Sequence, residues 1–127
     1  MRKSGILMPV ASLPGPYGIG SLGKPAFVFI DFLKKAGQKV WQMLPLSPTG
    51  FGDSPYQSCS AFAGNPYFID LDILRKKGLL KKGEYGAKEC CTNEGAVDYA
   101  ALYHSRYGIL RKAFARFSTW YPDDYYR

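Results

Sequence analysis

The sequence predicts an α/β protein that begins with a βαβ unit. Two short apolar runs, residues 6–10 and 40–46, are typical of buried strands. Between them, apolar side chains recur at helical spacing: Ala26, Phe29, Ile30 and Leu33. A strand, a helix and a strand within about 45 residues form a crossover, and such crossovers join parallel strands. Parallel strands are covered on both faces, which agrees with their continuously apolar sequences.

Local signals bound the predicted helix and isolate a long loop. Pro25 suits a first helical turn, where its missing N–H costs nothing, and Gly37 suits the position just after the helix. Residues 45–67 follow the second strand and are too long and too rich in Pro and Gly for an ordinary connection. Such loops are usually functional or disordered, and the aromatic residues spread through this one argue against disorder.

The second half of the sequence predicts two helices separated by a polar segment on the surface. Asp72 is expected to cap a brief helix that Gly78 ends, and residues 81–95 form a polar surface excursion. Asp98 is a good cap for a last helix running to about Phe117. Its predicted buried stripe is Leu102, Ile109, Leu110, Ala113, Phe114 and Phe117.

Composition excludes several classes of protein. A length of 127 residues allows one domain at most. The sequence contains no run of 18 apolar residues, which a membrane-spanning helix would need. Prolines interrupt the apolar stretch after the basic start, so no signal peptide is expected. One histidine and three cysteines without a C-x-x-C pattern predict no metal site, and we expect no cofactor. The simplest compartment is the reducing cytoplasm.

The formal charge of +7 could attract a polyanion. The basic residues come in scattered pairs, however, which favours a solvated surface over a nucleic-acid interface.

Two familiar motifs find no support. Gly18, Gly20 and Gly23 match G-x-G-x-x-G, but seven residues separate them from the strand, and no acid ends the second strand. A dinucleotide site is therefore not expected. His104 lies far from any G-x-S-x-G elbow and is interpreted as a surface or packing residue.

Residues 50–67 stand out chemically. They combine an isolated acid, hydroxyls, amides and aromatic rings on one loop. Sugars offer C–H faces to aromatic rings and hydroxyls that both donate and accept, so this mixture suits a neutral polyhydroxy ligand. The same Asp, Ser and Asn residues also favour turns, and a well-packed loop without a ligand is an open alternative.

The sequence resembles the amino-terminal part of the 4-α-glucanotransferases, also called amylomaltases or disproportionating enzymes (glycoside hydrolase family 77). The matching segments are Ser4-Gly5-Ile6-Leu7, Ser12-Leu13-Pro14-Gly15-Pro16-Tyr17-Gly18-Ile19-Gly20, Trp41-Gln42, Leu44-Pro45-Leu46, Pro48-Thr49-Gly50, Gly52-Asp53-Ser54-Pro55-Tyr56-Gln57 and Ser60-Ala61-Phe62-Ala63-Gly64-Asn65-Pro66-Tyr67. The last two segments are the most specific.

The resemblance implies a (β/α)₈ TIM barrel that is incomplete in this chain. Residues 1–127 would supply strands 1 and 2, the substrate loop 45–67 and the helical excursion. Barrel active sites lie at the carboxyl ends of strands, and this loop follows the second strand. A complete barrel needs about 250 residues, so we expect an amino-terminal part of a longer enzyme.

The resemblance also assigns substrate contacts. Tyr56 would lie against the sugar next to the bond being cut, and Ser54 would contact the neighbouring sugar. Phe51 stands where the family usually has a tyrosine for an outer glucan contact. Asp53 is a candidate that is expected to shape the loop more than to touch sugar, as are Gln57 and Asn65.

Other positions carry weaker expectations. Tyr103 matches a family tyrosine that could form an outer glucan contact, or it could simply pack. Cys59 replaces a usual phenylalanine, an exchange that could leave a void beside the loop.

The implied activity is transfer of a segment of an α-1,4-glucan to the 4-hydroxyl of glucose or a maltodextrin, by a retaining double displacement. The resemblance places the two catalytic carboxyl groups on later strands, so no catalytic residue is expected here and the chain alone should be inactive. Partners are expected to be maltodextrins, with no nucleic acid and no membrane. The alternatives are a non-catalytic carbohydrate-binding fragment and a basic nucleic-acid-binding domain.

Overall fold

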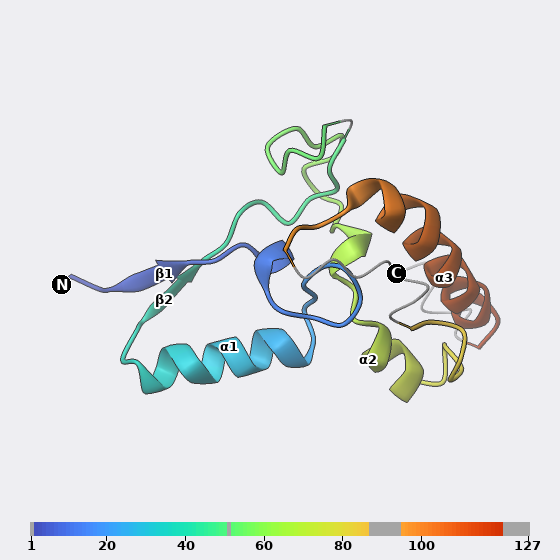
Figure 1. Ribbon diagram of the computed structural model, residues 1–127, viewed down its shortest axis with the longest axis horizontal. Helices are drawn as coiled ribbons and strands as arrows, with labels where there is room; N and C mark the ends of the chain where they lie inside the picture. The colour runs from blue at the N-terminus through green and yellow to red at the C-terminus, as the bar shows by residue number, and fades with distance from the viewer. Residues whose placement is uncertain (1, 51, 87–94, 121–127) are drawn as a thin grey trace. The chain divides into compact units, whose positions relative to one another are not determined.

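A computed structural model describes residues 2–50, 52–86 and 95–120. The chain forms two compact units. Unit 1 comprises Met1–Gly15 and Ile19–Ile69, and unit 2 comprises Pro16–Gly18 and Asp70–Arg127. Figure 1 shows the course of the chain, with the strands in unit 1 and the longest helix, α3, in unit 2. The two units are described separately below.

Unit 1 contains the predicted βαβ unit. Strands β1 (Gly5–Leu7) and β2 (Val40–Gln42) pair in parallel, with Ile6 opposite Trp41. The N–H of Lys39 donates to the Ser4 carbonyl oxygen and that of Met8 to the Gln42 carbonyl oxygen, each at 3.0 Å. The prediction of two parallel strands joined through a helix is therefore confirmed.

Both strands are shorter than the apolar runs predicted. After β1, Pro9 lacks an N–H and cannot continue a hydrogen-bonded ladder. Residues Val10–Ser12 then form a 3₁₀ turn in place of the predicted end of the strand. Val10 is buried there. An apolar run thus marks burial correctly but does not distinguish a strand from a turn that follows it.

Helix α1 (Lys24–Lys35) covers one face of the strands, as Figure 1 shows. Pro25 occupies its first turn, and Gly37 follows it with φ of 71°. Phe29 meets Trp41 edge-on, with ring centroids 5.1 Å apart. The indole N–H of Trp41 donates to the Met8 carbonyl oxygen at 2.8 Å. These contacts extend a small core whose buried members are Val10, Leu13 and Ala26.

The chain from residue 45 to 65 contains no helix or strand at the positions described, which include all but residue 51. A 3₁₀ turn, Pro66–Phe68, ends this segment. The N–H of Leu22 donates to the Phe68 carbonyl oxygen at 2.9 Å, which joins this turn to the chain entering α1.

Unit 2 is built from α2 (Leu71–Lys76) and α3 (Tyr99–Trp120). Its core consists of Leu71, Leu79, Leu80, Ile109 and Ala113. Gly78, with φ of 78°, follows α2 as predicted.

The predicted cap of α2 was wrong by two residues. Asp70, not Asp72, caps the helix, and its Oδ1 accepts the N–H of Ile73 at 2.9 Å. Asp72 Oδ1 instead accepts the hydroxyls of Tyr17 at 3.0 Å and Tyr85 at 2.8 Å. Burial raises the pKa of both tyrosines, and their bonds to Asp72 raise it further.

Helix α3 begins as predicted and ends later. Asp98 Oδ1 accepts the N–H of Ala101 at 3.0 Å, which confirms the cap, and the helix continues past Phe117 to Trp120. Phe114 was wrongly placed in the buried stripe and is exposed. Arg106 is buried instead, one helical turn after Leu102. Hydrophobicity alone could not identify a buried arginine on this face.

Candidate functional site

The base of the loop between β2 and the Pro66–Phe68 turn is closed by one backbone hydrogen bond. The N–H of Asn65 donates to the Leu46 carbonyl oxygen at 2.7 Å. Asn65 is buried, and its Oδ1 accepts the N–H of Tyr67 at 3.0 Å. Because this bond joins Leu46 to Asn65, the loop begins and ends at neighbouring points within unit 1. This matches the expectation that Asn65 shapes the loop.

The tip of the loop, residues 50–57, is closed by a second set of backbone bonds. The N–H of Gly50 donates to the Gln57 carbonyl oxygen at 3.2 Å. Within this tip, the backbone N–H of Asp53 donates to the Gly50 carbonyl oxygen at 3.2 Å, and the backbone N–H of Gln57 donates to the Ser54 carbonyl oxygen at 3.1 Å. Two successive turns therefore present the candidate residues.

Asp53 adopts a left-handed backbone conformation. Its φ is 56°, directly after Gly52 at 98°. Aspartate tolerates this region better than most residues because its short side chain can bond locally. The Asp53 side chain is exposed.

The structure brings Ser54 and Tyr56 together. Ser54 Oγ accepts the N–H of Tyr56 at 3.3 Å, which is a local turn contact. The Tyr56 side chain is 73% exposed, and Ser54 is half-buried. An exposed phenol on a braced backbone can present its ring face and its hydroxyl to a ligand at once. Phe51, the remaining candidate, lies outside the described residues.

A serine-rich turn follows the tip. Ser60 Oγ accepts the N–H groups of Phe62 at 3.3 Å and Ala63 at 3.2 Å, and Ser58 Oγ donates to the Ser60 carbonyl oxygen at 2.8 Å. Phe62 is fully exposed, and its neighbours Ala61 and Ala63 are exposed as well. Cys59 is also exposed.

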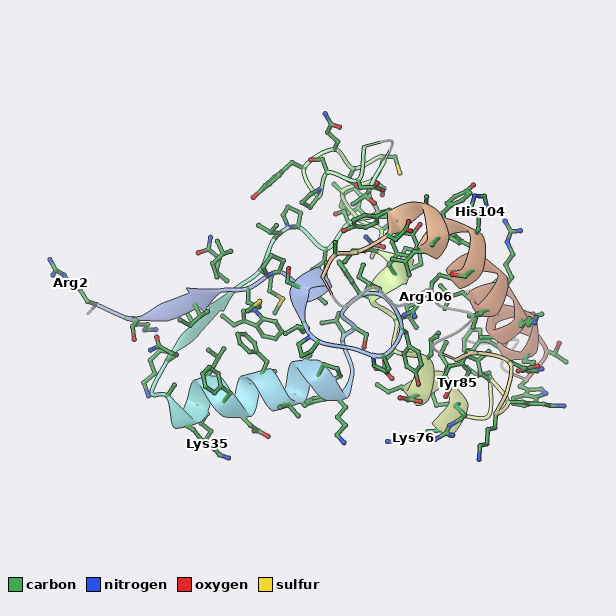
Figure 2. The ribbon with its side chains drawn as sticks, in the orientation of Figure 1. Arg2, Lys35, Lys76, Tyr85, His104 and Arg106 are labelled. Carbon is green, nitrogen blue, oxygen red and sulfur yellow. The ribbon has the colours of Figure 1, made fainter. Side chains whose placement is uncertain are left out.

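The remaining candidates lie outside this loop. His104 is exposed on α3 and contacts Tyr103 edge-on at 5.6 Å between ring centroids. Figure 2 labels His104 on that helix. Tyr103 is itself exposed and also meets Tyr107 at 5.4 Å.

One glycine of the G-x-G-x-x-G motif, Gly20, is required for close packing. A Cβ at Gly20 would overlap the Val10 carbonyl oxygen and lie 2.9 Å from the Leu13 Cβ. The backbone therefore approaches closely at this position, which only glycine permits. This accounts for one glycine of the motif without a phosphate ligand.

In residues 2–50, 52–86 and 95–120, no three His, Cys, Asp or Glu side chains cluster as metal ligands would. None of the helices described combines the length and the apolar character needed to cross a bilayer.

The Tyr17–Asp72–Tyr85 cluster was missed by sequence reasoning. Tyr17 lies in the segment 16–18, which packs with unit 2 although its neighbours in the sequence belong to unit 1. The tyrosine rings meet edge-on at 5.4 Å, and Figure 2 labels Tyr85 near α2. Fifty-five residues separate Tyr17 from Asp72, so no local pattern could have paired them.

A parallel βαβ unit with a braced, aromatic loop after its second strand defines an α/β protein with a candidate site at a strand end. A model of the 4-alpha-glucanotransferase family matches residues 8–124. The chain belongs to the 4-alpha-glucanotransferase family.

Individual relatives agree with this assignment. The chain is 54% identical over 112 residues to the 4-alpha-glucanotransferase of Clostridium butyricum, covering 88% of this chain and 23% of that protein. It is 51% identical over 116 residues to the enzyme of the same name from Thermus thermophilus, covering 91% of this chain and 22% of that protein.

A solved structure is also similar. The amylomaltase from Streptococcus agalactiae in complex with acarbose superimposes with a TM-score of 0.81 at 44% identity. The match covers 94% of this chain and 24% of that one. The chain therefore spans about a quarter of the length of the proteins that it resembles.

Proposed function

We propose that this chain is part of a 4-alpha-glucanotransferase and that its loop between β2 and the Pro66–Phe68 turn contacts the glucan. The proposed reaction transfers a segment of an α-1,4-glucan to the 4-hydroxyl of glucose or a maltodextrin. Family membership supports the activity, and the exposed Tyr56 on a loop closed at base and tip supports the role of the loop.

The proposed architecture is a (β/α)₈ barrel in which β1 and β2 are the first two strands. The parallel pairing of these strands and the crossover through α1 fit one repeat of such a barrel. In barrel enzymes the active site is formed by loops at the carboxyl ends of the strands. The loop after β2 starts at such an end.

Each candidate residue has a proposed role. The Tyr56 ring would stack on the C–H face of the sugar next to the bond being cut. The Ser54 hydroxyl would bond the neighbouring sugar, and Phe51 would contact glucan further out through its flat ring. Asp53 would act mainly by holding the tip in its left-handed conformation.

The proposed mechanism is a double displacement with retention. A carboxylate attacks the anomeric carbon while a second carboxyl protonates the leaving oxygen. An acceptor 4-hydroxyl, whose proton passes to that second group, then attacks the same carbon and releases the enzyme carboxylate. We assign neither carboxyl to this chain. Its part is to bind the glucan so that a sugar hydroxyl, in place of water, reaches the intermediate.

The proposed location is the cytoplasm. Cys59 carries a free, exposed thiol, which suits a reducing compartment.

The test is a fusion in which this chain replaces the matching segment of the Clostridium butyricum relative. The fusion is incubated with maltotriose, and products are separated by chain length. We expect both shorter and longer maltodextrins, whereas the 127-residue chain alone should give none. A folded fusion without transfer, beside an active parent enzyme, would contradict the proposal.

A further inference from the structure

The chain between β1 and α1 makes a narrow turn. We call this segment, residues 8–23, the β1 loop. A Cβ at Gly15 would lie 3.2 Å from the Ile19 carbonyl oxygen, so the backbone passes close to itself at these two positions. Residues 16–18 lie between them and form the end of the turn.

One side chain of this turn is held by an acid from α2. The Tyr17 hydroxyl donates to Asp72 Oδ1 at 3.0 Å, and the Tyr85 hydroxyl donates to the same oxygen at 2.8 Å. Hydrogen bonds to a carboxylate are roughly twice as strong as those between neutral groups. Tyr17 is half-buried, whereas residues 14–16 directly before it are exposed. The tyrosine therefore anchors the turn, and the residues before it are accessible.

The β1 loop and the loop after β2 begin at the same edge of the sheet. Because β1 and β2 pair in parallel, their carboxyl ends lie side by side. Loops at the carboxyl ends of neighbouring strands together form the active sites of barrel enzymes. The β1 loop thus begins beside the loop that carries Ser54 and Tyr56.

The exposed residues of the β1 loop suit a sugar chemically. Pro14 and Pro16 have no N–H, so their backbone offers carbonyl oxygens as acceptors and no donors. Sugar hydroxyls can donate to such oxygens, and the proline rings present C–H surface. Gly15 has no side chain that would keep a ligand away from the backbone.

We propose that residues 14–16 are a further contact for the glucan, and that Asp72 is a positioning residue that holds this contact in place through the Tyr17 hydroxyl. The proposal rests on the proposed function, because it needs a glucan bound at the loop after β2. Asp72 itself does not touch the sugar. Tyr85 lies outside the β1 loop, so its bond to Asp72 stabilises unit 2 without holding that loop.

The test uses four variants of the fusion with the Clostridium butyricum relative. Tyr17→Phe removes the hydroxyl that anchors the β1 loop and keeps the ring. Tyr85→Phe is the matched control, because it removes a bond to the same oxygen from a residue outside the loop. Asp72→Leu removes the acceptor, and Asp72→Asn keeps an acceptor oxygen at that position.

Electrophoresis in native gels that contain increasing amounts of amylose measures the Kd of each variant for an α-1,4-glucan. Tyr17→Phe and Asp72→Leu should raise this Kd by about fivefold or more, since each removes a bond to a charged group. Tyr85→Phe and Asp72→Asn should raise it by less than about twofold. The urea midpoint should fall similarly in Tyr17→Phe and Tyr85→Phe, which separates positioning from stability.

Equal changes of Kd in Tyr17→Phe and Tyr85→Phe, or an unchanged Kd in Tyr17→Phe, would overturn the proposal. A loss in Tyr17→Phe that Asp72→Leu does not share would also overturn it, because the tyrosine hydroxyl would then contact the sugar directly. If Asp72→Leu does not fold, the comparison of Tyr17→Phe with Tyr85→Phe decides.

Transfer of maltotriose by the same samples separates this proposal from the proposed function. The expected differences in Kd without any transfer would count against the proposed catalysis alone. Transfer by a fusion whose Kd is the same in all variants would count against the positioning role alone. An unaltered fusion that does not bind amylose would overturn both.

Discussion

Asp53 has an unusual backbone angle in the loop between β2 and the Pro66–Phe68 turn. Its φ of 56° turns the chain between Gly52 and Ser54, immediately before Tyr56. Glycine adopts such angles freely, aspartate with little cost, and β-branched residues only with strain. The conformation and the carboxylate can therefore be tested separately.

We predict that Asp53→Gly and Asp53→Asn leave kcat/KM for maltotriose nearly unchanged in the fusion enzyme. Asp53→Val should lower kcat/KM by about fivefold or more, because it resists the left-handed conformation. Steady-state kinetics checks all three variants. Equal losses in all of them would show that the carboxylate itself contacts substrate.

The sequence predicts Tyr56 as a candidate contact, but it does not predict the hydrogen bonds that hold the loop around it. The candidate lies in the motif Gly52-Asp53-Ser54-Pro55-Tyr56-Gln57. The bond from Gly50 to Gln57 and the bond from Asn65 to Leu46 close the loop in space. Such contacts depend on where the chain returns, which local composition does not specify.

Among the helices and strands, the features that the sequence predicted best are the ends of helices, which depend on nearby residues. Pro25, Gly37 and Asp98 bound the two longer helices as expected, because caps and turns act within a few residues. The cap of α2, which is Asp70 and not the predicted Asp72, shows the limit of predicting helix ends from nearby residues. Both aspartates suit a cap, and the distant Tyr17 and Tyr85 hydroxyls occupy the second of them.

Another long-range pair joins α3 to the turn after Leu80. Arg116 Nη2 lies 2.6 Å from Glu84 Oε1, and its Nη1 also donates to the Leu79 carbonyl oxygen at 2.9 Å. Glu84 Oε2 accepts the N–H of Lys81 at 2.7 Å. Hydrogen bonds from Arg116, and then from Lys81, lower the pKa of Glu84 from 4.5 to about 2.

This pair predicts a defined pH dependence. Because the folded-state pKa is depressed, the stabilisation is complete above pH 4.5 and is lost as the pH falls towards about 2. Glu84→Gln should lower the urea midpoint of α-helical unfolding at pH 6, and the difference from the unaltered chain should shrink below pH 4.5. Circular dichroism at several pH values measures this. A difference of the same size at pH 6 and pH 2.5 would contradict it.

For the whole molecule, the sequence predicted the α/β fold, but it did not predict which apolar side chains of the strands and of α1 would be exposed. The apolar runs correctly indicated parallel strands, whose usual environment is buried on both faces. In this chain Leu7, Val40 and several apolar side chains of α1 are exposed. The periodicity of a sequence indicates which side chains seek burial, whereas the neighbours that bury them must be found elsewhere.

The central claim is that Tyr56 contacts the glucan that is being transferred. The most direct measurement is kcat/KM for maltotriose in the fusion enzyme with Tyr56→Ala and with Tyr56→Phe. We predict a loss of about tenfold or more for alanine, which removes the ring, and a much smaller loss for phenylalanine, which keeps it. An alanine variant that folds and transfers maltotriose as well as the unaltered fusion would contradict the account.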